Sequence, residues 1–447
     1  MMHSRWSLPL LIATACSLPL AAQFGRGPAG PQRATTPPPL QFHFMGPATG
    51  GRIASAAGVP GDPSTYYLGS ASGGLWKSSD GGHTFLPIFD GQDAAAIGTI
   101  AVAPSDPNTV WVGTGEPWVI RASDVEGDGV YKSTDAGATW KNMGLPDSGR
   151  IARIVVNPTN PNLVFVCSEG HLSGEGQKGV YRSEDGGVNW KQVLFVDPKT
   201  SCSGLALDPQ HPDTMLAGMW TVEEHTWAEL SGGAGSGVYI SHDGGLNWTK
   251  ITAGMPHAPV GKVEVAIAPS NGQRMYALMQ TAEQGSLWRS DDGGANWQVA
   301  SWDRSLIGRA GYYFRMAVSP QNPDEVLISS SGFHRSMDGG HLFSGGGGFG
   351  GNGPRQASCG DCHDIWMDPK IPGRYALTED GGSSISTGTG EVLSVSLPNG
   401  QMYHVASDNR VPYWLYSNRQ DNGTWRGPST VSEPIGNARM PVDTFMP

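Results

Sequence analysis

The segment SEDGGVNW at Ser183–Trp190 recurs in altered form along the chain, and this repetition is the strongest indication of the fold. Six copies follow the pattern Ser-x-Asp-x-Gly-x-x-aromatic. The other complete copies are Ser78–Phe85, Ser133–Trp140, Ser241–Trp248, Ser290–Trp297 and Ser336–Phe343. A degenerate copy without the aspartate lies at Ser386–Gly390. Successive copies are about 50 residues apart, a period typical of repeat architectures such as propellers.

Each copy belongs to a longer unit with a constant order of elements. In the third unit the apolar run Ile154–Val156 comes first, followed by a turn bracketed by Pro158 and Pro161 and a second apolar run at Leu163–Val166. The segment Gly179–Arg182, of the form Gly-apolar-aromatic-basic, then leads into the box. The unit therefore predicts four short antiparallel strands, A to D, with the Pro turn between A and B and the box between C and D. Four such strands form one blade of a β-propeller.

The number of units sets the expected size of the propeller. Six complete boxes and a degenerate seventh predict an all-β protein, a seven-bladed β-propeller of four-stranded antiparallel blades over residues 40–425. A partial eighth unit opens at Met402, so eight blades or an incomplete larger propeller are the alternatives. The 64 Gly and 34 Pro among 447 residues agree with a turn-rich β protein, because both residues destabilise helix interiors.

The two ends of the chain differ from the repeats. Arg5, the apolar run Leu8–Leu20 and the small residues Ala21 and Ala22 predict a signal peptide over residues 1–22, and hence a secreted or periplasmic protein. Residues 23–39 are rich in Pro and Gly, which predicts a flexible linker. Residues 426–447 contain no box and are expected to form an irregular C-terminal tail.

Charge and hydropathy narrow the range of partners. The formal net charge of −11 argues against a nucleic-acid partner. The apolar run near the N-terminus is too short to span a bilayer comfortably, so no membrane span is expected. We expect a monomer whose ligand is a peptide, a protein or a glycan.

The boxes themselves predict a structural role. An aspartate in a tight turn accepts hydrogen bonds from the backbone amides that follow it. The closing Trp or Phe buries a large ring between blades. The aspartates assigned to this role are Asp80, Asp135, Asp185, Asp243, Asp292 and Asp338.

The boxes resemble the Asp-box, or BNR, repeats of sialidases, sortilin-type receptors and xyloglucanase-like glycoside hydrolases. The chain is similar in particular to bacterial secreted proteins with a sortilin N-terminal-type propeller, which are often labelled glycosyl hydrolases. The segments that carry this likeness are Gly46–Ile53, Gly69–Gly74, Gly113–Glu116, Gly360–Pro369 and Asp408–Asn422. The resemblance implies a propeller that either hydrolyses a glycan or binds a ligand.

The strand order assigns the loops to two faces. The Pro turns (A–B) and box turns (C–D) share one face, and the longer, more varied B–C loops and D–A connections share the other. Variable loops on a rigid scaffold are the usual place for binding, so we predict the site on the second face, around the central channel. The candidate ligand-binding residues are Arg52, Trp118, Arg153, Trp220, Arg309, Tyr312, Arg315 and His363. Glu116 and Asp361 are the candidate catalytic residues, because glycoside hydrolysis uses paired carboxylates.

Two functions follow from these residues. The resemblance to xyloglucanase-like enzymes implies a catalytic Asp before Gly73 and Gly74, but Ser72 stands there. Sialidases place a Pro after an early Arg-Ile, whereas Ala54 follows Ile53 here. We therefore favour an exported recognition module that binds a peptide, protein or glycan, with a xyloglucanase-like or sialidase-like glycoside hydrolase as the alternative.

The cysteines allow a third function. Cys359-Gly-Asp-Cys362-His363 fits the C-x-x-C-H pattern of c-type haem attachment, which would make the chain a redox propeller. A local disulfide, free thiols, or a pocket formed by Asp361 and His363 are the alternatives, and without haem no cofactor is expected. Asp361, His363 and Asp364 could also hold a cation, although no metal is the leading expectation. Cys167 and Cys202 lie in neighbouring units and could pair.

Overall fold

The computed structural model describes residues 50–117, 126–171, 174–225, 227–312, 314–345, 359–419 and 423–429. The expected signal peptide at 1–22, the linker at 23–39 and Trp118 lie outside these residues. Within them, the chain forms strands β1 to β31 in eight antiparallel sheets, together with the short 3-10 helix η1 (Arg304–Leu306). No helix among the described residues has the length and apolar character needed to cross a membrane.

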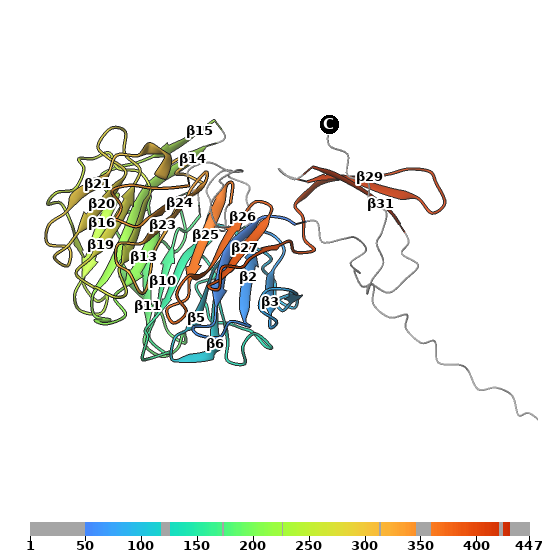
Figure 1. Ribbon diagram of the computed structural model, residues 1–447, viewed down its shortest axis with the longest axis horizontal. Helices are drawn as coiled ribbons and strands as arrows, with labels where there is room; N and C mark the ends of the chain where they lie inside the picture. Colours follow the sequence, from blue (N-terminus) through green and yellow to red (C-terminus); the bar gives the residue numbers. More distant parts are fainter. Residues whose placement is uncertain are drawn as a thin grey trace, which may run out of the picture. The chain divides into compact units, whose positions relative to one another are not determined.

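Six sheets repeat the predicted strand order from A to D, and a seventh repeats it from A to C (Figure 1). The A strands are β1 (Ile53–Gly58), β5 (Ile97–Ala103), β9 (Ile151–Val156), β13 (Thr200–Leu207), β18 (Val263–Ile267), β22 (Arg315–Val318) and β25 (Cys362–Met367). The B strands are β2 (Tyr66–Ser70), β6 (Asp106–Thr114), β10 (Val164–Ser168), β14 (Met215–His225), β19 (Met275–Met279), β23 (Val326–Ser329) and β26 (Arg374–Glu379).

The outer strands are shorter. The C strands are β3 (Leu75–Ser78), β7 (Val130–Ser133), β11 (Gly179–Ser183), β16 (Gly237–Ser241), β20 (Leu287–Ser290), β24 (Phe333–Ser336) and β27 (Gly382–Thr387). The D strands are β4 (Leu86–Pro87), β8 (Lys141–Asn142), β12 (Lys191–Leu194), β17 (Thr249–Lys250), β21 (Gln298–Ser301) and β28 (Val392–Val395). In the sheet of β22 to β24, an isolated bridge between Arg335 and Ser344 takes the place of a D strand.

The A strands contact one another in a closed cycle. β1 contacts β5, β5 contacts β9, and the contacts continue through β13, β18, β22 and β25 back to β1. The A strands are therefore the innermost strands, with the other strands of each sheet outside them. This arrangement confirms the predicted all-β propeller. The cycle contains seven sheets within the described residues, whereas the number of blades in the whole protein stays a prediction.

The core lies between neighbouring sheets. β9 and β10 are buried along most of their length, and both consist mainly of apolar residues, as is usual for strands covered on both faces. The fully buried Trp111 of β6 packs with Ile154 and Val164 of the next sheet. The ring of Trp190, which closes the third box, lies at the same interface, and its Nε1 donates to the carbonyl of Met143 at 2.8 Å. The boxes thus join neighbouring sheets as well as turning the chain.

Each complete box forms the same hydrogen-bonded turn. In the third box, Asp185 Oδ1 accepts from Ser183 Oγ at 2.8 Å and from the amide of Asn189 at 2.9 Å. Ser183 Oγ in turn accepts from the amide of Gly187 at 2.8 Å. Gly187 has φ +91°, a conformation that L side chains rarely adopt, so glycine is required there. The aspartate side chain therefore holds the turn, which is the geometry expected of a structural residue.

An eighth sheet follows β28. It contains β29 (Met402–Ser407), β30 (Trp414–Arg419) and β31 (Thr424–Pro428), and all six residues of β29 are exposed. Arg419 Nη1 donates to the carbonyl of Gly50 at 2.5 Å. β31 extends three residues into the segment 426–447 that was expected to be irregular, because its backbone pairs with β30. Residues 430–447 lie outside the described part of the chain.

The box aspartates predict how stability depends on acid. Hydrogen bonds from Asn189 and Ser183 lower the pKa of Asp185 from 3.8 to about 2. A carboxyl whose folded pKa is depressed stabilises the fold above its unfolded pKa, and this contribution is lost as pH falls through the folded pKa. We expect Asp185→Asn to lower the melting temperature at pH 7. The gap in melting temperature between this variant and the unmodified chain should shrink as the pH falls from 4 to 2. Calorimetry across this pH range measures both effects.

The control is Glu283→Gln, an exposed carboxyl outside the boxes. It should leave the melting temperature and its acid dependence unchanged. Equal melting temperatures for Asp185→Asn and the unmodified chain at pH 7 would contradict a structural role for this aspartate.

Candidate functional site

Charged side chains gather on the face formed by the B–C loops and D–A connections. Arg52 lies directly before β1, and His363 is the second residue of β25. Glu116 and Asp380 follow the B strands β6 and β26, and Tyr312 lies in the D–A connection before β22. Because adjacent strands run antiparallel, the start of an A strand and the end of a B strand lie at one edge of the sheet. We call Arg52, Glu116, Tyr312, His363 and Asp380 the Arg52 cluster.

Arg52 is the centre of this cluster. Its Nη1 donates to Glu116 Oε1 at 2.8 Å, and its Nε donates to Asp380 Oδ1 at 3.0 Å. Its guanidinium carbon lies 5.1 Å from the centroid of the Tyr312 ring. The side chains of Arg52 and Glu116 are each only 4% exposed. Buried charges need partners of opposite sign, and here one guanidinium serves two carboxylates.

Asp380 receives three polar partners on one oxygen. Besides Arg52, the hydroxyl of Tyr312 donates to Asp380 Oδ1 at 3.0 Å, and His363 Nε2 lies 3.1 Å from the same atom. Burial alone would raise the pKa of Asp380. The hydrogen bonds and charges of His363, Arg52 and Tyr312 outweigh burial and lower this pKa to about 2. Asp380 is therefore an ionised carboxylate over the whole physiological pH range.

Glu379, the residue before Asp380, has a pKa shifted in the opposite direction. Burial raises the pKa of Glu379, and the negative charges of Asp380 and Asp361 add to this rise. The amide of Gly360 donates to Glu379 Oε2 at 3.2 Å and opposes it. Two neighbouring carboxyl groups with pKa values moved apart can serve as a proton donor and a permanent negative charge.

A second set of ion pairs crosses the centre of the ring. Arg153 Nη1 donates to Asp364 Oδ1 at 3.0 Å, and Arg315 Nη1 donates to Glu264 Oε2 at 2.7 Å. Arg315 Nη2 also donates to the carbonyl of Ala152 at 2.6 Å. β9 is not a neighbour of β22 or β25 in the cycle of A strands. The bonds from Arg153 to Asp364 and from Arg315 to Ala152 therefore join sheets that are not neighbours in the ring.

Glu169 lies apart from these pairs. It directly follows β10 and is 4% exposed, and among the described residues neither of its carboxylate oxygens has a hydrogen-bond partner. Burial raises the pKa of Glu169, and the positive charge of Lys262 is the strongest of the influences that oppose the rise. Lys262 directly precedes β18, and burial lowers its pKa to about 8. The nitrogen of Lys262 lies 4.8 Å from the centroid of the Trp220 ring.

The structure brings together only some of the predicted site residues. Of the two candidate catalytic residues, Glu116 belongs to the Arg52 cluster. Asp361 does not belong to this cluster, and its amide donates to the carbonyl of Ser331 at 3.3 Å. Its contribution to the site is the negative charge that it places near Glu379.

The candidate ligand-binding residues divide in the same way. Arg52, Tyr312 and His363 form the Arg52 cluster, and Arg153 and Arg315 form the ion pairs across the ring. Arg309 is exposed, and its guanidinium carbon lies 5.5 Å from the centroid of the Tyr312 ring. Trp220 is fully buried and its Nε1 donates to Ser231 Oγ at 2.9 Å, so it packs within the protein. Trp118 lies outside the described residues.

Five charged residues of the site were missed by the sequence analysis. They are Glu169, Lys262, Glu264, Glu379 and Asp380. A usable signal existed, because each lies within two residues of the end of a largely apolar strand (β10, β18 or β26), on the B–C or D–A side. A charged residue at that place borders the central channel, where water is scarce and a partner is needed.

The cysteines form two disulfides. Cys359 pairs with Cys362, and Cys167 of β10 pairs with Cys202 of β13, which joins two neighbouring sheets. The thiols that a c-type haem would need are therefore joined to each other. His363 is fully buried, with Nδ1 2.8 Å from the carbonyl of Ile53 and Nε2 beside Asp380. As placed, these residues do not fit covalent haem attachment.

The cation alternative has no support from the same region. Asp364 pairs with Arg153, whereas His363 faces Asp380. Among the described residues, no group of three or more His, Cys, Asp or Glu side chains is arranged to hold a metal ion.

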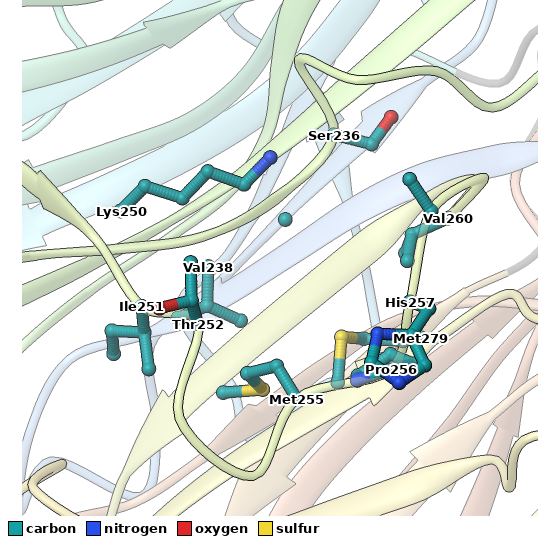
Figure 2. Close-up of a pocket in the computed structure, with 12 residues that line it drawn as sticks. Ser236, Val238, Lys250, Ile251, Thr252, Met255, Pro256, His257, Val260 and Met279 are labelled. Atoms are coloured by element: carbon teal, nitrogen blue, oxygen red, sulfur yellow. The ribbon is translucent and has the colours of Figure 1, made fainter.

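A cavity of about 240 Å³ lies elsewhere, between the fourth and fifth sheets (Figure 2). It is lined by Lys250, Thr252, Met255, His257 and Met279, among others. The side chains of Met255 and Met279 lie on one side of this space with His257, and Lys250 lies opposite. Among the described residues, its lining contains no carboxylate. The buried charges at the centre of the ring therefore remain the candidate site for chemistry.

Comparison with known proteins adds family matches and relatives. The Sortilin-Vps10 family (Sortilin, neurotensin receptor 3) matches residues 73–203, and the BNR/Asp-box repeat matches residues 239–250. A probable oligoxyloglucan-reducing end-specific xyloglucanase of Neosartorya fischeri is 23% identical over 374 residues, which are 73% of this chain and 41% of that protein. A xyloglucanase of Hypocrea jecorina is 29% identical over 219 residues, which are 43% of this chain and 25% of that protein.

Solved structures resemble the chain at the level of the fold. An ancestral GH74 enzyme has a TM-score of 0.50 and 16% identity, and the match covers 87% of this chain and 56% of that chain. PorZ, a surface component of the type-IX secretion system of Porphyromonas gingivalis, also has a TM-score of 0.50, with 10% identity and coverage of 84% and 44%. The repeats, the sheets around their A strands and these matches show an Asp-box (BNR) repeat β-propeller. The chain spans less than half the length of the two xyloglucanases.

The Arg52 cluster predicts a large effect on stability. Arg52→Met leaves Glu116 and Asp380 buried without their shared cation, so we expect a loss of about 3–5 kcal/mol in the free energy of unfolding. Chemical denaturation measures this loss. Arg410→Met is the matched control, because Arg410 pairs with Asp408 at 2.9 Å on the surface and an exposed pair contributes about 0–1 kcal/mol. Equal losses for the two variants would contradict the central place of Arg52.

Proposed function

We propose that this propeller acts on a polysaccharide as a glycoside hydrolase, at the face formed by the B–C loops and D–A connections. The similarity to xyloglucanases over as many as 374 residues supports a polysaccharide, and xyloglucan is the first substrate to test. The observation that carries hydrolysis is the pair Glu379 and Asp380, whose pKa values are moved in opposite directions. Glycoside hydrolysis uses one protonated and one ionised carboxyl group.

The two carboxyl groups have distinct roles in this proposal. Glu379, whose pKa is raised by burial, is the group that we assign to give a proton to the glycosidic oxygen as the bond breaks. A water molecule then adds to the sugar carbon and returns a proton to Glu379. Asp380 is ionised and is held by Arg52, His363 and Tyr312, so it places a fixed negative charge where positive charge develops on the sugar ring.

Exposed aromatic rings on the same face suit a polysaccharide. Trp227, between β14 and β15 (Ala228–Ser231), is 81% exposed, and Trp302, in the D–A connection after β21, is 63% exposed. Single exposed rings are common on protein surfaces, so the relevance of these two rings is their place on the face of the proposed site. Such rings offer flat apolar surfaces to the faces of sugar rings, while carboxylates accept hydrogen bonds from the hydroxyl groups.

The test is the release of reducing ends from xyloglucan. We expect Glu379→Gln and Asp380→Asn each to lower kcat by roughly 10²-fold or more, as is typical when a general acid or a charge-stabilising group is removed. Activity should fall as pH rises through the raised pKa of Glu379, because only the protonated acid donates.

Two controls accompany this assay. Glu325→Gln, which removes a carboxyl paired with Arg335 at 2.6 Å outside the channel, should leave the rate unchanged. Thermal melts must show that each variant is folded. A folded Glu379→Gln variant with an unchanged rate would contradict the assigned acid.

Recognition without cleavage is the second candidate, and a specific residue favours it. The resemblance to xyloglucanase-like enzymes implies an acid at the position of Ser72, which is exposed and lacks a carboxyl group. A recognition propeller would bind xyloglucan, a peptide or a protein and release no reducing ends. Binding measured by calorimetry beside the release assay therefore separates the two functions.

We also propose export, as the predicted signal peptide implies. The two disulfides support this location, because disulfides persist in oxidising compartments. Protein recovered from a bacterial periplasm or culture medium should begin at Gln23, as measured by mass spectrometry. Recovery of the chain in the cytoplasm with Met1 intact would contradict export.

A further inference from the structure

A disulfide lies directly beside the proposed acid. Cys359 and Cys362 are three positions apart, so their bond closes a tight loop. Cys362 begins β25 and is paired in register with Glu379, the last residue of β26. Residues paired across two antiparallel strands have their side chains on the same face of the sheet. The closed loop therefore borders the side chain of Glu379.

One hydrogen bond joins this loop to the acid. The amide of Gly360, which lies between the two cysteines, donates to Glu379 Oε2 at 3.2 Å. Among the described residues, it is the only hydrogen bond that this carboxyl group accepts. The direction in which Glu379 points therefore depends on where the loop holds the amide of Gly360.

Backbone contacts with the preceding sheet hold one side of the loop. The amide of Cys362 donates to the carbonyl of Ser330 at 2.9 Å, and the amide of Asp361 donates to the carbonyl of Ser331 at 3.3 Å. Both carbonyls belong to the B–C loop between β23 and β24. An isolated bridge between Gly332 and Gly360 continues this pairing. The disulfide adds the covalent tie that joins the two ends of the loop.

The backbone of the loop has a conformation that needs such a tie. Asp361 has φ +54°, in the left-handed region that residues other than glycine adopt rarely. Gly360 is exposed, so water competes for its amide. Without the disulfide, Asp361 is free to return to a negative φ, and this rotation moves Gly360 away from Glu379. The disulfide opposes the motion that would break the hydrogen bond to the acid.

We propose that Cys359 and Cys362 are positioning residues, whose disulfide holds the amide of Gly360 against Glu379 and so directs the acid toward the sugar. The inference rests on the proposed function, because the role of the two cysteines depends on Glu379 being the acid. It adds a means of regulation to that function. The site is complete only while the two cysteines are oxidised, and disulfides persist in the oxidising compartments to which exported proteins go.

The groups around Glu379 set the direction of the expected change. The charged or titratable side chains near it are His363, Asp380 and Asp361. β1 and β27, which also contact β26, carry no ionisable side chain. The hydrogen bond from Gly360 lowers the pKa of Glu379 by more than the charge of Asp361 raises it. Loss of the loop contact should therefore raise the pKa of Glu379 further.

The experiment measures release of reducing ends from xyloglucan by two variants of the full chain. Cys359→Ser/Cys362→Ser should lower kcat by roughly tenfold or more with KM nearly unchanged, because a displaced acid is badly placed for proton transfer. The fall of its activity at alkaline pH should move to higher pH. Gly360→Pro removes the amide donor and should reproduce both effects. A free-thiol assay checks that its disulfide is intact.

The other disulfide provides the matched control. Cys167 and Cys202 are 35 positions apart, so their bond constrains the unfolded chain more than a bond across three positions. Cys167→Ser/Cys202→Ser should therefore lower the melting temperature more, yet leave kcat and the pH profile unchanged. Losses of activity that simply follow the losses of melting temperature in the two double variants would overturn the positioning role.

A measurement without substrate keeps this inference distinct from the proposed function. Carboxyl-carbon NMR of the glutamate-labelled chain, with Glu379→Gln to assign the resonance, measures the pKa of Glu379 directly. No release of reducing ends by the unmodified chain contradicts the proposed function, and the role in proton transfer fails with it. Suppose instead that release requires Glu379, while Cys359→Ser/Cys362→Ser changes neither the rate nor this pKa. That result overturns only the positioning role and leaves the hydrolase proposal standing.

Discussion

The pairing of Arg52 with Glu116 and Asp380 is the interaction on which both the fold and the site depend. Arg52 opens the first sheet and Asp380 belongs to the sheet of β25, the last in the cycle, 328 residues away along the chain. The same guanidinium reaches Glu116 at the end of β6 in the second sheet. A closed ring of sheets needs contacts between its first and last members, and here those contacts are also the buried charges of the candidate site.

Local repetition explains why the fold could be predicted. Each box completes its own turn within a few residues, as Ser183, Asp185 and Gly187 do. The pattern can therefore be recognised from a single short stretch of sequence. The order of strands within one unit then followed from Pro turns and apolar runs. β31 was not predicted, because no box precedes it and its strand character depends on pairing with β30.

The site was harder to predict because its contacts are long-range. Glu116 and Tyr312 were identified from their loops. The place of Asp380 in the site depends on its contacts with Arg52 and His363, and no local sequence pattern reveals these contacts. Glu169 was missed for the same reason, since its surroundings come from three sheets. The pattern Cys359 to His363 left a haem, a local disulfide and a pocket open, because a five-residue motif does not show that His363 turns toward Asp380 and that the two cysteines pair.

Neighbouring charges on the rigid scaffold have different roles. Paired residues such as Arg315 and Glu264 hold the centre of the ring together, whereas Glu379 and Glu169 retain carboxyl groups with raised pKa values. A fold of this kind supports many functions, so the site must carry the functional argument. The most direct test is an experimental structure of the full chain with a bound xyloglucan oligosaccharide. We expect the sugar over the centre of the ring, within hydrogen-bonding distance of Glu379. A sugar seated only in the cavity beside Met255 and His257 would contradict the proposed site.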